Sequence, residues 1–216
     1  MKLLTQIANS YGTDKGTTKY PHHGFSEIYD DFLNYKRFDI KKVLEIGIDD
    51  GFSLRMWRDF FPNATVYGMD VQARQLFSEQ RIVTRLGNQA IDNDLNNLIK
   101  DVGGDFDLII DDGGHVPTHQ QITLGYLFKF LKNKGIYIVE DLHTSFMKDW
   151  LSPLGLCEDS PETAYNVLKK MEVNGELITP FINEGDIKYI KDNLKSIRIF
   201  DLNEDKKHIT SILEKL

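Results

Sequence analysis

The middle of the chain alternates between short apolar runs and segments with helical periodicity, and this alternation constrains the fold more than any other feature. The apolar runs predict buried strands over 41–48, 64–71, 81–88, 106–111 and 135–142. Between them, apolar residues at helical spacing predict helices over 53–61, 93–102 and 118–131. Repeated strand–helix–strand units with apolar strands are typical of a parallel sheet that helices cover on both faces.

The last part of the chain has a different pattern. Two strand-like runs, 196–202 and 208–216, are joined by a polar segment and predict an antiparallel hairpin at the end of the sheet. We therefore expect a single doubly wound α/β domain over 1–216, with a mostly parallel sheet of seven strands. Its expected parts are an N-terminal helical segment (1–38), a core (41–145), a helical lid (149–194) and the C-terminal hairpin (196–216).

Composition narrows the class of partner. The 216 residues suit one domain, and the net charge of -7 argues against nucleic acid, because binding the phosphate backbone needs clustered Lys and Arg. The only cysteine, Cys157, excludes an intrachain disulfide and a cysteine-based metal cluster. The N-terminal residues lack the apolar stretch of a secretion signal, and no run of about 18 apolar residues occurs. We expect a cytoplasmic protein with no membrane association.

Nearly every predicted strand ends on a carboxylate. Strand ends carry Glu45, Asp70, the pair Asp111-Asp112 and the pair Glu140-Asp141, with His115 and His143 just beyond the last two. Ligands of open parallel sheets bind outside the carboxyl ends of the strands. Because buried charges are costly unless they are paired, bound to a metal or solvated in a cleft, these acids indicate a binding site.

The turn after the first strand indicates the ligand. It reads G-I-D-D-G over 47–51, so Asp49 stands where a dinucleotide fold would have its second glycine, and its charge would repel a pyrophosphate. Asp70 follows at the distance expected of an acid that binds a ribose. A ribose with a cationic tail and no phosphate describes S-adenosylmethionine. Asp49 and Asp50 could also simply cap the following helix.

These stretches resemble a known family. "VLEIGIDDGFSLRMWRDFFPNATVYGMDV" (43–71) is similar to the first motifs of class I S-adenosylmethionine-dependent methyltransferases. Together with "SYGTDKGTTKYPHHGFSEIYDDF" (10–32), "FDLIIDDGGH" (106–115) and "IYIVEDLHTS" (136–145), it resembles the macrolide-sugar O-methyltransferases of the mycinamicin and macrocin type and their relatives in bacterial polysaccharide clusters. Phe52 departs from the pattern, since relatives often have a second glycine there.

The resemblance implies a magnesium-assisted transfer of a methyl group to a sugar hydroxyl. Matched by motif, Asp112 and Asp141 correspond to metal ligands, His115 to the catalytic base, and Glu27 to a third metal ligand. Strand position and resemblance assign cofactor contacts to a further set of residues, which comprises Glu45, Gly47, Asp70, Asn88, Gln89 and Asp111. Asp111 could instead cap a helix, and His22-His23 could contact substrate.

General chemistry supports the metal and the base independently of the resemblance. The strands that end near Asp112 and Asp141 are expected neighbours, about 4.8 Å apart. Two carboxylates that close need a proton or a cation between them, and carboxylate oxygens favour Mg²⁺. The turn at Gly113-Gly114 would aim His115 back over the strand ends, where an imidazole could take a proton from an acceptor hydroxyl.

Two other functions stay open. One is a metal-independent methyltransferase acting on a phenolic, amine or phosphoramidate acceptor, and the other is a non-catalytic module that binds S-adenosylmethionine. The acceptor could be a glycoside, a nucleotide sugar or a polysaccharide precursor, because no run of residues dictates which. A homo-oligomer is equally open.

Overall fold

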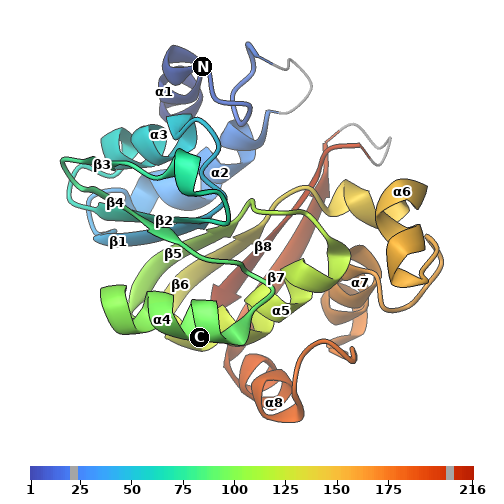
Figure 1. Cartoon of the computed structure of the whole chain (residues 1–216). Coiled ribbons are helices and arrows are strands. Elements are labelled where there is room, and N and C mark those ends of the chain that lie inside the picture. The colour runs from blue at the N-terminus through green and yellow to red at the C-terminus, as the bar shows by residue number, and fades with distance from the viewer. Residues whose placement is uncertain (20–23, 203–206) are drawn as a thin grey trace.

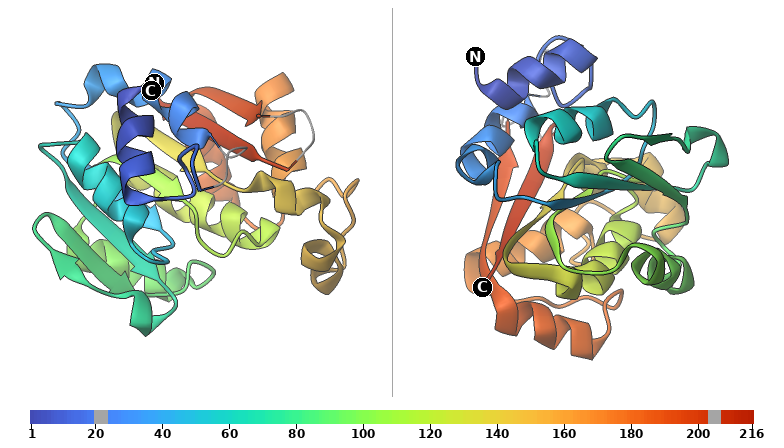
Figure 2. Two further views of the ribbon diagram at one scale, coloured as in Figure 1. Left: turned by 90° about the horizontal axis from the view of Figure 1, so that it is seen from above. Right: turned by 90° about the vertical axis from the view of Figure 1, so that its left-hand side faces the viewer.

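The computed structural model describes residues 1–19, 24–202 and 207–216. His22 and His23 lie outside the described residues, as does most of the turn of the expected C-terminal hairpin. One sheet crosses the whole domain, with helices on both of its faces (Figures 1 and 2). The doubly wound α/β class predicted from the sequence is therefore confirmed.

The sheet has eight strands among the described residues. In spatial order they are β3 (Ser78–Glu79), β4 (Ile82–Leu86), β2 (Thr65–Asp70), β1 (Lys42–Ile46), β5 (Phe106–Asp111), β6 (Leu131–Val139), β8 (Ile209–Lys215) and β7 (Leu194–Asp201). The prediction of seven strands missed β3, because two residues paired antiparallel with β4 are too short to show a periodicity. The five strands from β4 to β6 are parallel, as expected.

Alternate residues of each central strand face opposite layers of helices. Val43 packs with one layer and Leu44 with the other, which explains why these strands are apolar throughout. The first layer contains α1 (Leu3–Tyr11), α2 (Phe25–Leu33) and α3 (Phe52–Phe60). The second contains α4 (Asp92–Val102), α5 (Pro117–Leu127), α7 (Ala164–Asn174) and α8 (Glu184–Asn193).

The segment expected to form a lid is mostly part of the body of the domain. Buried residues of α7, such as Val167 and Leu168, belong to the same core cluster as the strands, and so does Ile190 of α8. The short helix α6 (Lys148–Leu151) lies near His115 instead, with the Trp150 ring centred 6.3 Å from the His115 ring. Single 3₁₀ turns complete the chain at Asn34–Lys36, Ala73–Gln75, Phe128–Phe130, Leu142–Phe146 and Ser152–Leu154.

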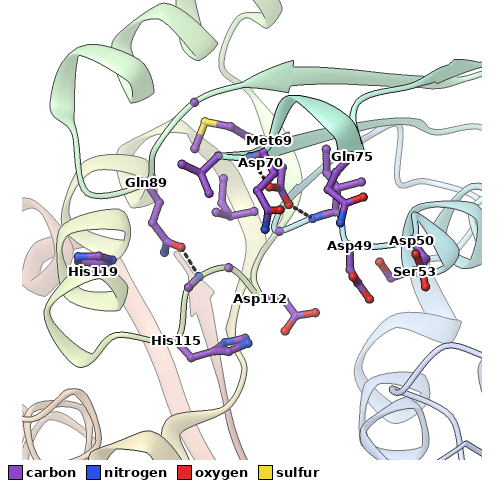
Figure 3. A pocket seen from close by; sticks show the side chains of 18 of the residues that line it. Asp49, Asp50, Ser53, Met69, Asp70, Gln75, Gln89, Asp112, His115 and His119 are labelled. Atoms are coloured by element: carbon purple, nitrogen blue, oxygen red, sulfur yellow. Dashed lines mark hydrogen bonds between the residues drawn. The ribbon is translucent and has the colours of Figure 1, made fainter. Parts of the chain in front are cut away.

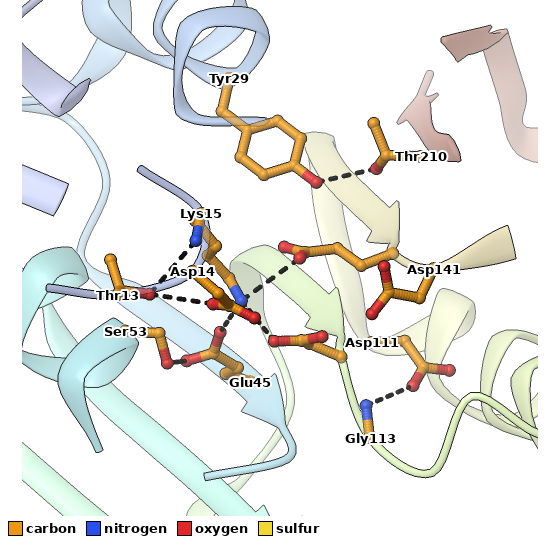
Figure 4. Close-up of polar contacts among 12 residues, drawn as sticks. Thr13, Asp14, Lys15, Tyr29, Glu45, Ser53, Asp111, Gly113, Asp141 and Thr210 are labelled. Carbon is orange, nitrogen blue, oxygen red and sulfur yellow. Dashed lines mark hydrogen bonds and ion pairs between the residues drawn. The ribbon is translucent and has the colours of Figure 1, made fainter. Parts of the chain in front are cut away.

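The C-terminal hairpin forms as predicted, and β8 lies between β6 and β7, antiparallel to both. Its Thr210 hydroxyl lies 2.8 Å from the Tyr29 hydroxyl, which joins α2 to the far end of the chain (Figure 4). In the described part of the chain, no helix combines the length and the apolar character needed to cross a membrane.

Candidate active site

A cavity of about 460 Å³ opens at the carboxyl ends of β1, β2, β4 and β5 (Figure 3). This volume lies within the range of small-molecule binding sites. Five acids contribute to its wall, namely Asp14, Asp49, Asp50, Asp70 and Asp112. Gly47, Asn88, Gln89 and His115 line it as well, so the structure brings most of the predicted site residues together.

Gly47 makes the turn at the end of β1, where only glycine fits. Its φ is 90°, a backbone conformation that other residues rarely adopt. A Cβ atom built on Gly47 would lie 2.1 Å from the main-chain carbonyl oxygen of Asp112. The ends of β1 and β5 are also joined directly, because the Asp112 amide donates to the Ile46 carbonyl at 3.0 Å. The glycine therefore sets the position of Asp112.

Asp70 ends β2 and fixes the two loops around it. One carboxylate oxygen accepts from the Ile48 amide at 2.9 Å, and the other accepts from the Gln72 amide at 2.7 Å. A carboxylate has about four lone-pair sites, so Asp70 can still accept hydrogen bonds from a ligand in the cavity. This arrangement suits the predicted role of binding a ribose.

Asn88 and Gln89 follow β4 and hold the opposite wall of the cavity. The Asn88 side-chain oxygen accepts from the Ala90 amide at 2.9 Å, and the Gln89 side-chain oxygen accepts from the Gly114 amide at 2.7 Å. The Gln89 amide group also donates to Asp111 at 2.9 Å. Gln89 therefore fixes the D-D-G-G-H turn as well as lining the cavity.

Two acids predicted to contact the cofactor lie behind the cavity wall instead. Asp111 is 1% exposed, and burial raises its pKa to about 7 although Gln89 donates to it. Glu45 is fully buried, accepts a hydrogen bond from Ser53 at 2.8 Å, and has a pKa that burial raises to about 7 against the opposing effect of Lys15. Neither lines the cavity, because the alternation of a strand turns them into the protein interior.

Beside the cavity lies a group of residues that could hold a cation. Asp112, His115 and Asp141 offer ligand atoms that all lie within 4.8 Å of one another. His115 Nε2 lies 3.4 Å from one Asp141 oxygen, and His143 Nδ1 lies 3.5 Å from the other. Burial raises the pKa of Asp141 to about 6, an effect that His115 opposes and Asp112 adds to.

His115 and Asp141 both adopt left-handed backbone conformations, with φ of 51° and 55°. Residues other than glycine adopt this conformation at an energetic cost, and such strain clusters at functional sites. The Thr144 hydroxyl donates to the His115 carbonyl at 2.7 Å and so ties the two strained turns together. The two left-handed turns direct both side chains into the same space above the strand ends.

Glu27 does not join this group among the described residues. It is exposed on α2, where Phe25, Tyr29 and Leu33 form the buried face. A helix advances about 100° per residue, so Glu27 points away from that face. The sequence assignment of Glu27 as a metal ligand is not supported by its position.

Sequence reasoning missed Lys15, which is fully buried at the acidic strand ends (Figure 4). Its ammonium group pairs with Asp112, with Glu140 at 3.2 Å and with Glu45 at 3.4 Å. Burial alone would lower the pKa of Lys15, but these three carboxylates and that of Asp14 raise it well above its usual range. The only sequence signal was its place in the G-T-D-K-G motif, far from Asp112 in the chain.

Comparison with known proteins identifies relatives of this chain. It is 32% identical over 177 residues to L-olivosyl-oleandolide 3-O-methyltransferase from Streptomyces antibioticus, covering 77% of this chain and 44% of that protein. It is 35% identical over 150 residues to demethylmacrocin O-methyltransferase from Streptomyces fradiae, covering 66% of this chain and 37% of that protein. The chain thus spans less than half the length of these relatives. No protein-family model matches it.

Comparison with solved structures shows similarity to the same group of methyltransferases. The MycE methyltransferase from the mycinamycin biosynthetic pathway, in complex with Mg, SAH and mycinamycin VI, superposes with a TM-score of 0.78 at 26% identity. The match covers 98% of this chain and 54% of that one. The resemblance to macrolide-sugar O-methyltransferases that the sequence motifs predicted is therefore confirmed.

Proposed function

We propose that this relative of the macrolide-sugar O-methyltransferases transfers a methyl group from S-adenosylmethionine to a sugar hydroxyl, with the assistance of Mg²⁺. The observation that carries the proposal is the group formed by Asp112, His115 and Asp141 at the edge of an acidic cavity. The cavity suits the cofactor, and the group suits the metal and the acceptor. The names of the relatives support the type of reaction and the class of acceptor.

The wall of the cavity favours a cationic nucleoside over a dinucleotide. Asp49 and Asp50 place two carboxylates in the turn where a dinucleotide fold would bind its pyrophosphate. The same charges attract the sulfonium of S-adenosylmethionine. Asp70, held by two backbone amides, presents its remaining lone pairs to the ribose hydroxyls. The role of these residues in the cavity wall is to bind and orient the cofactor.

The residues present fit a divalent cation. Asp141 Oδ1 and His115 Nδ1 are buried, yet neither makes a hydrogen bond to any described residue. Asp112 and Asp141 supply the hard carboxylate oxygens that Mg²⁺ prefers. When bound there, Mg²⁺ supplies a Lewis acid that takes up acceptor oxygens and favours loss of the hydroxyl proton.

His115 is the base of the proposed reaction. Its imidazole lies beside Asp141 on the rim of the cavity, and its side chain is 26% exposed. Asp141 lies within reach of Nε2 and can stabilise the imidazolium that forms when the ring accepts a proton. Methyl transfer needs the acceptor oxygen in line with the methyl group and the sulfonium sulfur. Apart from the proton transfer to His115, most of the rate enhancement therefore comes from holding the acceptor and the cofactor in this geometry at the carboxyl ends of the strands.

The acceptor of the proposal is a small saccharide-bearing molecule, because the name of one relative, L-olivosyl-oleandolide 3-O-methyltransferase, specifies a glycosylated acceptor. The overall net charge of -7 argues against a nucleic acid acceptor. A cytoplasmic location, where the cofactor is available, completes the proposal.

A direct test measures methyl transfer from labelled S-adenosylmethionine to a panel of glycosides and nucleotide sugars, with Mg²⁺ and with EDTA after extensive dialysis. We expect transfer to a sugar hydroxyl in Mg²⁺ and none in EDTA, with S-adenosylhomocysteine affinity nearly unchanged. Full activity in EDTA would favour the metal-independent methyltransferase. Cofactor binding without transfer to any acceptor class, including phenols and amines, would favour the non-catalytic module.

A further inference from the structure

Two buried side chains, Thr144 and Gln120, cross between the segments that carry His115 and Asp141. Thr144 belongs to the 3₁₀ turn that follows Asp141, and its hydroxyl donates to the main-chain carbonyl of His115 at 2.7 Å. Gln120 belongs to α5, which follows His115, and its side-chain amide donates to the main-chain carbonyl of Glu140 at 2.8 Å. Each segment thus sends one side chain to the main chain of the other.

The local structure of its turn does not by itself explain the Thr144 hydroxyl. A threonine often hydrogen-bonds to the carbonyl three or four residues earlier, and the Thr144 hydroxyl does so with Asp141 at 3.2 Å. Its shorter bond goes to His115, 29 positions away in the sequence. Thr144 and Gln120 are only 1% and 2% exposed, so their donors bond to the protein rather than to water. The two bonds are therefore features of how the segments pack together.

Both turns need such support, because both are strained. His115 and Asp141 have φ of 51° and 55°, a left-handed conformation that costs energy for most residues other than glycine. Strain of this kind persists only where the surrounding structure holds the residue in place. The Thr144 bond holds the His115 carbonyl, and the Gln120 bond holds the peptide group immediately before Asp141. Loss of either bond lets one turn relax toward an ordinary conformation.

We propose that Thr144 and Gln120 are positioning residues, which hold the His115 imidazole and the Asp141 carboxylate at a fixed separation. His115 Nε2 lies 3.4 Å from an Asp141 oxygen, and this separation lets both groups face one acceptor hydroxyl. Neither Thr144 nor Gln120 lines the cavity or belongs to the group that could hold a cation, so both act through His115 and Asp141. For the roles of those two residues, the inference rests on the proposed function.

Replacing Thr144 tests the positioning role directly. Thr144→Val keeps the shape of the side chain and removes the donor, while Thr144→Ser keeps the donor. Loss of a group that orients a metal ligand typically costs about 10–100-fold in metal affinity or activity. We expect Thr144→Val to lower kcat for methyl transfer by about this factor, with the KM for S-adenosylmethionine unchanged. It should also weaken the binding of Mn²⁺, measured by electron paramagnetic resonance of the free ion. Thr144→Ser should recover most of both losses, and Gln120→Met, which removes the other donor, should act like Thr144→Val.

Thr84→Val is the matched control. Thr84 is a buried residue of β4 whose hydroxyl donates to the main-chain carbonyl of Phe77 at 2.6 Å, and it does not line the cavity. This variant should lower the midpoint of urea unfolding at least as much as Thr144→Val, but leave kcat and Mn²⁺ affinity unchanged. The NMR signals of the histidine rings give a third readout that needs neither turnover nor metal. The His115 signal, assigned with His115→Gln, should shift in Thr144→Val and stay in place in Thr84→Val.

The outcomes separate the inference from the proposed function. A wild-type chain that transfers no methyl group or binds no Mn²⁺ contradicts the proposed function, and the His115 signal then still tests the two bonds. The inference is overturned if Thr144→Val or Gln120→Met keeps the wild-type value of any of these quantities that the wild-type chain shows. It is also overturned if Thr144→Ser does not recover what Thr144→Val loses. If neither Thr144→Val nor Gln120→Met folds, the two residues support the fold as a whole, which overturns the inference as well.

Discussion

Replacing Gly47 with alanine tests whether the turn after β1 sets the position of Asp112. An alanine there adopts a φ near 90°, and a left-handed conformation costs an L-residue about 1–2 kcal/mol. Its Cβ would also meet the Asp112 carbonyl oxygen at 2.1 Å and the Gly113 Cα at 3.0 Å, which are backbone atoms that cannot rotate away. Forced overpacking of this kind costs about 1–3 kcal/mol more.

Gly155→Ala separates the two effects. Gly155 has a φ of 70°, and an added Cβ there meets nothing within 4 Å. This control should therefore lose about 1–2 kcal/mol of unfolding free energy from strain alone. Gly47→Ala should lose about 2–5 kcal/mol, since it carries the strain and the contact together.

Urea unfolding followed by circular dichroism gives both free energies, and calorimetry gives the affinity for S-adenosylhomocysteine. Because the contact pushes Asp112 away from the β1 turn, Gly47→Ala should weaken cofactor binding by about tenfold or more, equivalent to about 1.4 kcal/mol, while Gly155→Ala leaves it unchanged. Equal stability of the two variants, with cofactor affinity intact in both, would refute the reasoning about this turn.

Three further results are expected. Asp70→Ala should weaken S-adenosylhomocysteine binding by about 1.5–3 kcal/mol in calorimetry, because a charged acceptor for the ribose is lost; tight NAD binding instead would contradict the cofactor assignment. His115→Gln should lower the methyl-transfer rate by about 10²–10⁴-fold with cofactor binding retained, and the fall in rate toward acidic pH, where a protonated ring cannot accept a proton, should disappear; an unchanged profile would make His115 structural. Burial raises the pKa of Glu45 from its usual 4.5 to about 7 in the folded state, so between these pH values the folded state binds more protons than the unfolded state. The stability that Glu45 contributes is therefore full below about pH 4.5 and is lost as the pH rises through about 7. The expected change in unfolding free energy is about 3 kcal/mol. Urea unfolding of Glu45→Gln across this range should show a weaker fall in stability than wild type, and an identical pH dependence would show that Glu45 does not cause it.

The strands and the proximity of Asp112 to Asp141 could be predicted because both follow from local patterns. Apolar runs define β1, β2 and β5, and parallel neighbours bring their carboxyl ends to one edge. The register of β5 with β6 pairs Asp111 with Val139, and the Glu140 amide donates to the Asp111 carbonyl at 2.9 Å. That register places Asp112 opposite Glu140, and Asp141 follows at the same edge in a left-handed conformation, so the Asp112 and Asp141 carboxylates come within 4.8 Å of one another.

The remaining features depend on contacts that a local pattern does not contain. Lys15 reaches Asp112 across 97 positions in the sequence, and nothing near it marks a buried lysine. Asp111 and Asp112 look equivalent in the sequence, yet the alternation of a strand buries one behind Gln89 and exposes the other to the cavity. The helices of 149–194 carry ordinary amphipathic patterns, which cannot distinguish a lid from a layer of the core.

The position of β8 has a consequence for how the protein is made. β8 is synthesised after β6 and β7, yet it pairs with both of them in the finished sheet. Until 209–215 emerge, the edge of β6 exposes unpaired amides and carbonyls, and β7 has no neighbour to pair with. Bare strand edges recruit other chains. Slow translation just before these codons would therefore lengthen the period in which the nascent protein is prone to aggregate.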